Sequence, residues 1–141
     1  MFIVFYGSED DKSYIIDRAL KFSHALATDI YLTISSRLNI DLFYDVGLSA
    51  GLGYLGLQGP NRFKKTTITG RPAIIAKRLE STGKSIRCEN PNHSFPHLLI
   101  DEDIYTVASR NTLFNKHSFN RVKINNDGLK NMKVYDWQFQ D

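Results

Sequence analysis

Residues 46–81 read VGLSAGLGYLGLQGPNRFKKTTITGRPAIIAKRLES, and this stretch decides the fold that we expect for the chain. Residues 42–48 have the composition of a strand, and a turn at 57–61 leads into a second strand-like run at 63–69. Gly-Arg-Pro at 70–72 then ends that strand and begins a helix, because proline is well tolerated near the first helical position. The stretch therefore predicts a strand, a glycine-rich hairpin and a helix.

Two features of this stretch concern phosphate binding. Its glycines include a GxGxxG pattern at 51–56, but a turn and a strand follow instead of a helix, so the pattern does not fit a dinucleotide fingerprint. A strand, a tight glycine turn and a helix N-terminus nevertheless form a good place to hold an anion. The basic residues around this turn in the sequence are Lys64, Lys65, Arg71, Lys77 and Arg78.

The rest of the chain predicts a sheet with packed helices. Ser8 and the acidic residues at 9–11 are typical of a helix N-terminus, with Ser8 as the capping residue. Apolar residues recur at three- and four-residue spacing from Lys12 to Thr28, which indicates an amphipathic helix. The helix that begins near Arg71 is expected to stop at Thr82-Gly83. Strands are expected at 2–6 and 98–100, either a short strand or an irregular edge at 30–34, and a closing hairpin at 121–124 and 132–137.

Length and composition bound the class of protein. The chain has 141 residues, of which 42% are hydrophobic, so we expect a single domain over 1–141 with one real core. A net charge of +3 is mild and by itself says little about nucleic acid, which we do not expect as a partner. The single cysteine, Cys88, excludes an internal disulfide and suits a reducing compartment. No apolar run has the length of a membrane helix, so the expected location is the cytoplasm.

The focal stretch resembles the second half of the class III adenylate/guanylate cyclase catalytic domain. Residues 98–109 are similar to that family's ILIS strand and the helix after it, and 122–135 are similar to its closing hairpin. FIVFYG at 2–7 resembles the strand that ends the family's metal-bearing hairpin. The positions of the focal stretch that follow the family pattern are Val46, Gly47, Gly51, Gly56, Gly59, Thr67, Gly70, Ala76, Arg78, Leu79, Glu80 and Ser81.

The resemblance implies an α+β fold, a ferredoxin-like sandwich with an antiparallel sheet and helices on one face. It also implies that the N-terminal strand and first helices of the cyclase-homology fold are lacking. Such a chain should have an exposed sheet edge and an uncovered apolar face. We therefore expect a homodimer, or a heterodimer with another cyclase-like chain.

The resemblance also implies which chemistry is retained. The family's two metal-binding aspartates would precede Met1, so the chain alone should hold no metal, and Mg²⁺ or Mn²⁺ would bind only if a partner supplies them. Arg71 stands where the family has a base-contacting aspartate, and Ile74 stands where it has a ribose-orienting asparagine. Arg78 matches the transition-state arginine and is the one candidate catalytic residue. The candidate nucleotide-binding residues are Lys64, Lys65, Thr67, Gly70 and Arg71.

Three functions follow as hypotheses. The first is a catalytically inactive cyclase-like domain that acts as a dimerisation or nucleotide-sensing module. The second is the C-terminal piece of a split or truncated purine nucleotide cyclase, active only with a partner that brings the metal-binding half. The third is a nucleotide or oligonucleotide binder without turnover. In each case the ligand would be a nucleoside triphosphate or another nucleotide.

Three other groups of residues have a weaker functional interpretation. Cys88, His93 and His97 have part of the spacing of a zinc site, but a fourth ligand is not evident. Cys88 and His93 as a catalytic pair would lack an orienting acid. Tyr135 and Trp137 fall on one face of a strand, where they could stack on a base, although packing is the commoner use of such aromatic residues.

Overall fold

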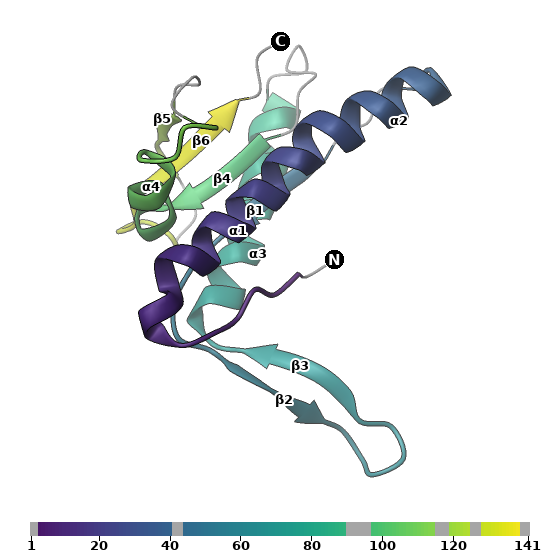
Figure 1. The fold of residues 1–141 in the computed structure, drawn as a ribbon, viewed down its shortest axis with the longest axis vertical. Coiled ribbons are helices and arrows are strands. Elements are labelled where there is room, and N and C mark those ends of the chain that lie inside the picture. The colour runs from purple at the N-terminus through teal and green to yellow at the C-terminus, as the bar shows by residue number, and fades with distance from the viewer. Residues whose placement is uncertain (1–2, 41–43, 90–96, 115–118, 125–127, 139–141) are drawn as a thin grey trace.

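The computed structural model describes residues 3–40, 44–89, 97–114, 119–124 and 128–138. Its architecture is mixed α and β, as the sequence predicts (Figure 1). Helical and strand elements follow in the order η1 (Glu9–Asp11), α1 (Lys12–Ala25), η2 (Leu26–Ile30), α2 (Tyr31–Leu38), β1 (Asp45–Leu48), β2 (Tyr54–Gln58), β3 (Lys65–Thr69), α3 (Arg71–Glu89), β4 (His97–Asp101), α4 (Glu102–Ala108), β5 (Phe119–Val122) and β6 (Val134–Gln138).

The four-stranded sheet is mixed and has the order β1-β4-β6-β5. β1 runs parallel to β4, with Val46 opposite Leu98, whereas β6 runs antiparallel to both β4 and β5. β2 and β3 form a separate antiparallel hairpin that projects from the body of the molecule (Figure 1). The glycine-rich hairpin predicted before α3 and the predicted closing hairpin are thus both confirmed, although residues 57 and 58 belong to β2 and not to the turn.

Helices cover both faces of the four-stranded sheet, and β4 is therefore buried on both sides. Leu98 and Ile100 point into a cluster with α1, α4 and Trp137. Leu99, between them, points into a second cluster with Ile75 and Leu79 of α3. Alternation along a strand produces this division. The expectation of an antiparallel sheet with helices on one face is therefore wrong, because the β1–β4 pair is parallel and α3 lies opposite α1.

The strand expected at 2–6 does not form in its described part, residues 3–6. Phe5 packs against α1 instead, with its ring 5.9 Å from that of Phe22 and the Arg18 guanidinium 5.9 Å from its centre. An apolar run rich in β-formers can be buried by a helix as well as by a sheet, and composition does not separate the two cases.

The helix predicted over 12–28 is longer than expected, and the expectation of a short strand or an irregular edge at 30–34 is wrong. A π-helical stretch, η2, joins α1 to α2, so the helical path continues to Leu38 (Figure 1). It ends at Asn39, whose φ of 49° places it in the left-handed region that terminates helices. The capping role of Ser8 is also wrong, because its hydroxyl donates to the Asp11 carboxylate and not to a backbone group.

The predicted stop of α3 at Thr82-Gly83 is wrong as well, since the helix continues to Glu89. Gly83 lies inside the helix and is buried, and a Cβ there would lie 2.7 Å from Leu99 Cδ1. The glycine is therefore present for close packing of α3 on the sheet and not for a helix end.

Candidate interaction surface

The β2–β3 hairpin has a regular register and glycines at its two bends. Gln58 lies opposite Lys65 at the far end, and Tyr54 lies opposite Thr69 near the body. Gly59 has a φ of 120° and Gly70 a φ of 130°, both in the left-handed region that side chains rarely adopt. These glycines start the loop at the tip and end β3 at the base of the hairpin.

The hairpin exposes large apolar side chains that an isolated protein would be expected to bury. Leu52 is 84% exposed, Leu57 66% and Phe63 73%. By strand alternation the exposed Leu55 and Leu57 share one face with the half-buried Ile68, and we call it the aliphatic face of the hairpin. A cluster of exposed apolar side chains of this kind is typical of an interaction surface.

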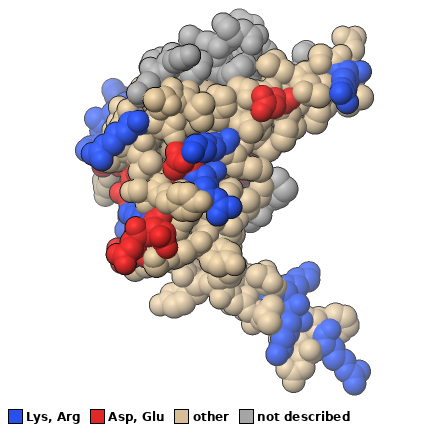
Figure 2. Space-filling view, viewed as in Figure 1, with Lys and Arg blue, Asp and Glu red and all other residues tan. Residues whose placement is uncertain are grey.

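The same hairpin is basic. No acidic residue occurs between Asp45 and Glu80, and the exposed cations Arg62, Lys64 and Lys65 lie in or beside its far loop. None of the three forms an ion pair with a residue that the structure describes. Lysine and arginine side chains therefore mark the projecting hairpin in the surface view (Figure 2).

The candidate nucleotide-binding residues lie along the hairpin and do not surround one corner. Lys64 and Lys65 are at its far end, and Thr67, whose hydroxyl donates to the Lys65 carbonyl over 3.3 Å, is midway. Gly70 forms the turn into α3, and Arg71 is the first residue of that helix. At about 3.3 Å per residue, the Lys65 and Thr69 backbones are roughly 13 Å apart along β3, and Arg71 lies two residues beyond the end of that strand.

Arg78 lies farther along α3. Its Nη1 donates to the Gly128 carbonyl oxygen over 3.0 Å, which ties the helix to the segment before β6. The ion-pair partner of Glu80 in α3 is Lys77. Arg71 and Arg78 nevertheless share one exposed face of α3 with Ile74, at spacings of three and four residues.

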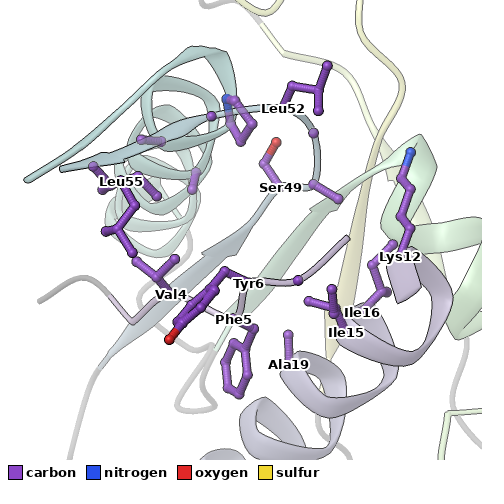
Figure 3. A pocket seen from close by; sticks show the side chains of 18 of the residues that line it. Val4, Phe5, Tyr6, Lys12, Ile15, Ile16, Ala19, Ser49, Leu52 and Leu55 are labelled. Carbon is purple, nitrogen blue, oxygen red and sulfur yellow. The ribbon is translucent and has the colours of Figure 1, made fainter. Parts of the chain in front are cut away.

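A groove opens beside the base of the hairpin, with a cavity of about 360 Å³. Figure 3 shows Val4 and Tyr6 of the N-terminal segment on one side of it and Leu55 of the hairpin on another. Ile15 and Ile16 of α1 also line the cavity, and Ser49 follows β1 at its floor. The groove is mainly apolar, and its lining combines segments that are far apart in the sequence.

Sequence reasoning missed the role of Asp101. Its Oδ1 accepts from the Ile104 amide over 3.0 Å and caps α4, while its Oδ2 accepts from the Ser49 hydroxyl over 2.6 Å and from the Ala50 amide over 3.3 Å. Burial raises the pKa of this carboxyl, and the three hydrogen bonds oppose that shift. An aspartate directly before a predicted helix was the available sequence signal.

The partial zinc motif does not come together in the described residues. Cys88 is exposed at the end of α3, and His93 lies outside the described residues. His97 is buried, and its Nδ1 lies 3.1 Å from Asp136 Oδ2. No group of three or more His, Cys, Asp or Glu side chains that could hold a metal ion occurs in residues 3–40, 44–89, 97–114, 119–124 and 128–138.

The aromatic residues of β6 have a packing role. The Tyr135 ring stacks on Tyr105 at 3.8 Å, and Trp137 is fully buried against Phe114 and His24. Both side chains belong to the cluster on the α1 face of the sheet, so the predicted shared face is confirmed. His24 is likewise a packed histidine of this cluster.

Comparison with protein-family models, with curated proteins and with solved structures finds no match to this chain. In the part of the chain that the structure describes, no helix has the length and apolar character needed to cross a membrane.

Proposed function

We propose that the chain is a protein-interaction module that pairs with a second copy, or with a similar chain, through the β2–β3 hairpin. The observation that carries this proposal is the exposed aliphatic face of a hairpin that projects from the body (Figures 1 and 2). A two-stranded hairpin is marginally stable by itself in water. Covering Leu55, Leu57 and Phe63 with a partner would remove their apolar surface from water and stabilise the hairpin.

The basic far loop complements an acidic part of the same molecule. Glu9 and Asp10 are exposed in η1, and neither forms an ion pair with another described side chain. Opposite charges on the hairpin and near α1 favour a contact between two copies and would speed their association.

The test is sedimentation equilibrium or light scattering at tens of micromolar protein. Replacing two leucines of the aliphatic face (Leu55→Ser with Leu57→Ser) should raise the dimer dissociation constant at least about tenfold, because hot-spot truncations commonly cost more than 1 kcal/mol each. The matched control replaces two exposed leucines of α2 (Leu32→Ser with Leu38→Ser), and it should leave association unchanged. A wild-type chain that remains monomeric under these conditions contradicts the proposal.

As part of this proposal, the chain is a relative of the class III cyclase domain and its fold is a variant of the ferredoxin-like fold. Supporting it is the order of the elements, because a strand, a glycine-rich hairpin, a helix, a strand, a helix and a closing hairpin occur at the positions that the resemblance implies. Arg71 and Ile74 in place of an acidic and an amide residue favour an inactive, regulatory role. Arg78, already bonded to Gly128, would serve structure in such a module.

A second candidate is a nucleotide or oligonucleotide binder without turnover. The unpaired cations at the hairpin tip and the exposed rings of Tyr54 and Phe63 favour it, since cations and aromatic rings together bind single strands. Binding of a labelled oligonucleotide would then weaken with salt and on Lys64→Ala with Lys65→Ala. Arg71→Ala, at the other end of the hairpin, distinguishes binding along the hairpin from binding at its tip.

The split-cyclase hypothesis also remains a proposal. It requires a partner that brings metal-binding aspartates, and co-purification of the chain with such a partner should then produce metal-dependent cyclic nucleotide. Arg78→Ala would lower that activity, whereas a chain that only dimerises would produce none with or without the substitution.

A further inference from the structure

β1 is an edge strand with one unused side. Among the described residues its only strand partner is β4, so the backbone groups on its other side face away from the sheet. Such an edge presents a row of amide and carbonyl groups that an additional strand can pair with. Edge strands are usually covered or charged, but β1 carries one charge, Asp45, which is engaged by Arg87 at 2.9 Å.

Two cavities lie along this strand, with volumes of about 360 and 350 Å³. Both are lined by Ile3 and Phe5 of the N-terminal segment, by Leu48 of β1 and by Ala76 of α3. Together they form one trough, which we call the edge groove. Figure 3 shows the first of these cavities, with Val4, Phe5 and Tyr6 lying across from β1.

The charges around the edge groove are almost all paired within the chain. Lys12 pairs with Asp103 at 2.7 Å, and Lys77 pairs with Glu80. Only Glu9, at one end, lines the groove without an ion pair to a described residue. A ligand that matches the charges of the edge groove is therefore uncharged along most of its length. It can carry one cation, which would lie beside Glu9.

The opposite wall is itself strand-like in composition. Ile3 to Tyr6 is rich in β-formers but pairs with no described strand, and it lies across the edge groove from β1. One strand between the two would supply hydrogen-bond partners to the β1 edge and apolar contacts to the N-terminal segment. A small molecule could fill the cavities, but it would not pair with a row of backbone groups.

We propose that the edge groove binds an extended, uncharged aliphatic strand from a partner polypeptide, which adds to the sheet beside β1. The groove runs from Tyr44 to Ala50, so the bound strand has about seven residues at roughly 3.3 Å each. This contact differs from the hairpin contact proposed above because it is made by the backbone edge of β1, although Leu55 and Ile68 of the hairpin also line the first cavity.

The test uses a soluble peptide of about seven alternating Val, Ile and Thr residues flanked by lysines, since these residues favour strands. Hydrogen exchange of the β1 amides is followed by NMR in the full chain. Saturating peptide should slow exchange of alternate β1 amides at least about tenfold, as expected for newly bonded groups. The same peptide with a central proline should not, because proline removes an amide donor.

Two variants separate the groove from nonspecific binding. Ile3→Lys places a charge in the groove and should abolish the protection, while Ile40→Lys, at a residue of nearly equal exposure outside it, should preserve the protection. Ala76→Arg, which fills both cavities, should also abolish it. Peptide binding should survive in a hairpin variant at two exposed residues that line neither cavity (Leu57→Ser with Phe63→Ser), whereas dimerisation through the hairpin should weaken in it, so failure of the dimer proposal and failure of this one are distinguishable.

Three results overturn the proposal. The first is unchanged β1 exchange in a folded chain with millimolar peptide. The second is that the β1 amides without peptide exchange as slowly as they do with peptide, at every protein concentration. This result would mean that the chain fills its own groove. The third is protection that rises with protein concentration alone, which assigns the groove to a second copy.

Discussion

Asp101 joins two elements through one buried carboxylate. It lies at the end of β4, caps α4 through the Ile104 amide, and accepts from Ser49 and Ala50 just after β1. Its burial is tolerated because three donors satisfy its oxygens. Removing it would leave a helix amide and a hydroxyl without their acceptor, so the cost is larger than that of an ordinary surface carboxylate.

Asp101→Ala is accordingly expected to lower the free energy of unfolding by about 2–4 kcal/mol, since it loses both a helix cap and a charged hydrogen bond. Urea denaturation measures the change. Asp103→Ala, at an exposed residue in the same helical turn that pairs with Lys12, is the control and should cost less than about 1 kcal/mol. Equal losses in the two variants would contradict the role given to Asp101.

His97 and Asp136 form a buried pair whose stabilising effect depends on pH. The hydrogen bond to Asp136 raises the pKa of His97 above its ordinary value of 6.5, and burial opposes this shift. The folded state therefore binds the proton more tightly than the unfolded state. The contribution of the His97–Asp136 pair to stability is fully present below pH 6.5. It is lost as the pH rises through the pKa of His97 in the folded protein.

We expect the free energy of unfolding, measured in urea from about pH 6 to about pH 9, to fall as the pH rises through this window. Asp136→Asn removes the carboxylate that raises the His97 pKa and should flatten the curve. If the free energy of unfolding falls with pH as steeply in Asp136→Asn as in the wild type, another group is responsible for the pH dependence.

At the scale of elements, α3 packs on β1 so closely that a side chain at Gly47 has no room. A Cβ there would lie 2.2 Å from the Ala76 carbonyl oxygen and 2.6 Å from the Glu80 amide nitrogen, both of them backbone atoms of α3. Backbone cannot give way as a flexible side chain can, so the helix would have to move. Close packing here places Ala76 at the wall of the edge groove.

Gly47→Ala should therefore destabilise the chain by about 1–3 kcal/mol or more, in the range of overpacked cores. Thermal unfolding followed by circular dichroism measures the change. Gly56→Ala is the control, because a Cβ at Gly56 meets no atom within 4 Å, and alanine should have little effect there. The account of α3 packing fails if the two variants unfold at the same temperature.

Element identity was easier to predict than element ends. The strand at 98–100, the hairpin over 51–69 and the helix after Pro72 carry clear local signals and are confirmed. The helix ends were misjudged because Gly83 has the signal of a stop but the function of a packing residue, and because 30–34 has β-branched residues inside a helix. Tertiary contacts override weak local preferences in both places.

At the scale of the whole molecule, residues of the projecting hairpin and of the free β1 edge line the same cavity. The candidate residues Lys64, Lys65, Thr67, Gly70, Arg71 and Arg78 lie along this region but do not converge on one point. This arrangement suits contact with an extended or macromolecular partner better than enclosure of a small substrate.

The chain alone is expected to produce no cyclic nucleotide from ATP, GTP, CTP or UTP with Mg²⁺ or Mn²⁺. Under the proposed resemblance to cyclases, Arg71 would reverse the charge where such an enzyme contacts the base, and Ile74 would offer no hydrogen bond to a ribose. Chromatographic detection of the product, against a heat-treated sample, measures this. Product above that control would contradict the inactive module and favour an enzyme.

The sequence by itself determined the mixed class of the fold, the glycine-rich hairpin, the start of α3 and the closing hairpin, because each depends on local propensity and turn chemistry. Only the tertiary structure decided that helices cover both faces, that residues 3–6 pack on α1, and that Gly83 and Asp101 serve long-range contacts. These features depend on which surfaces meet in space, and no local pattern encodes that. The edge groove is of the same kind, since β1, α3 and the N-terminal segment form it only together.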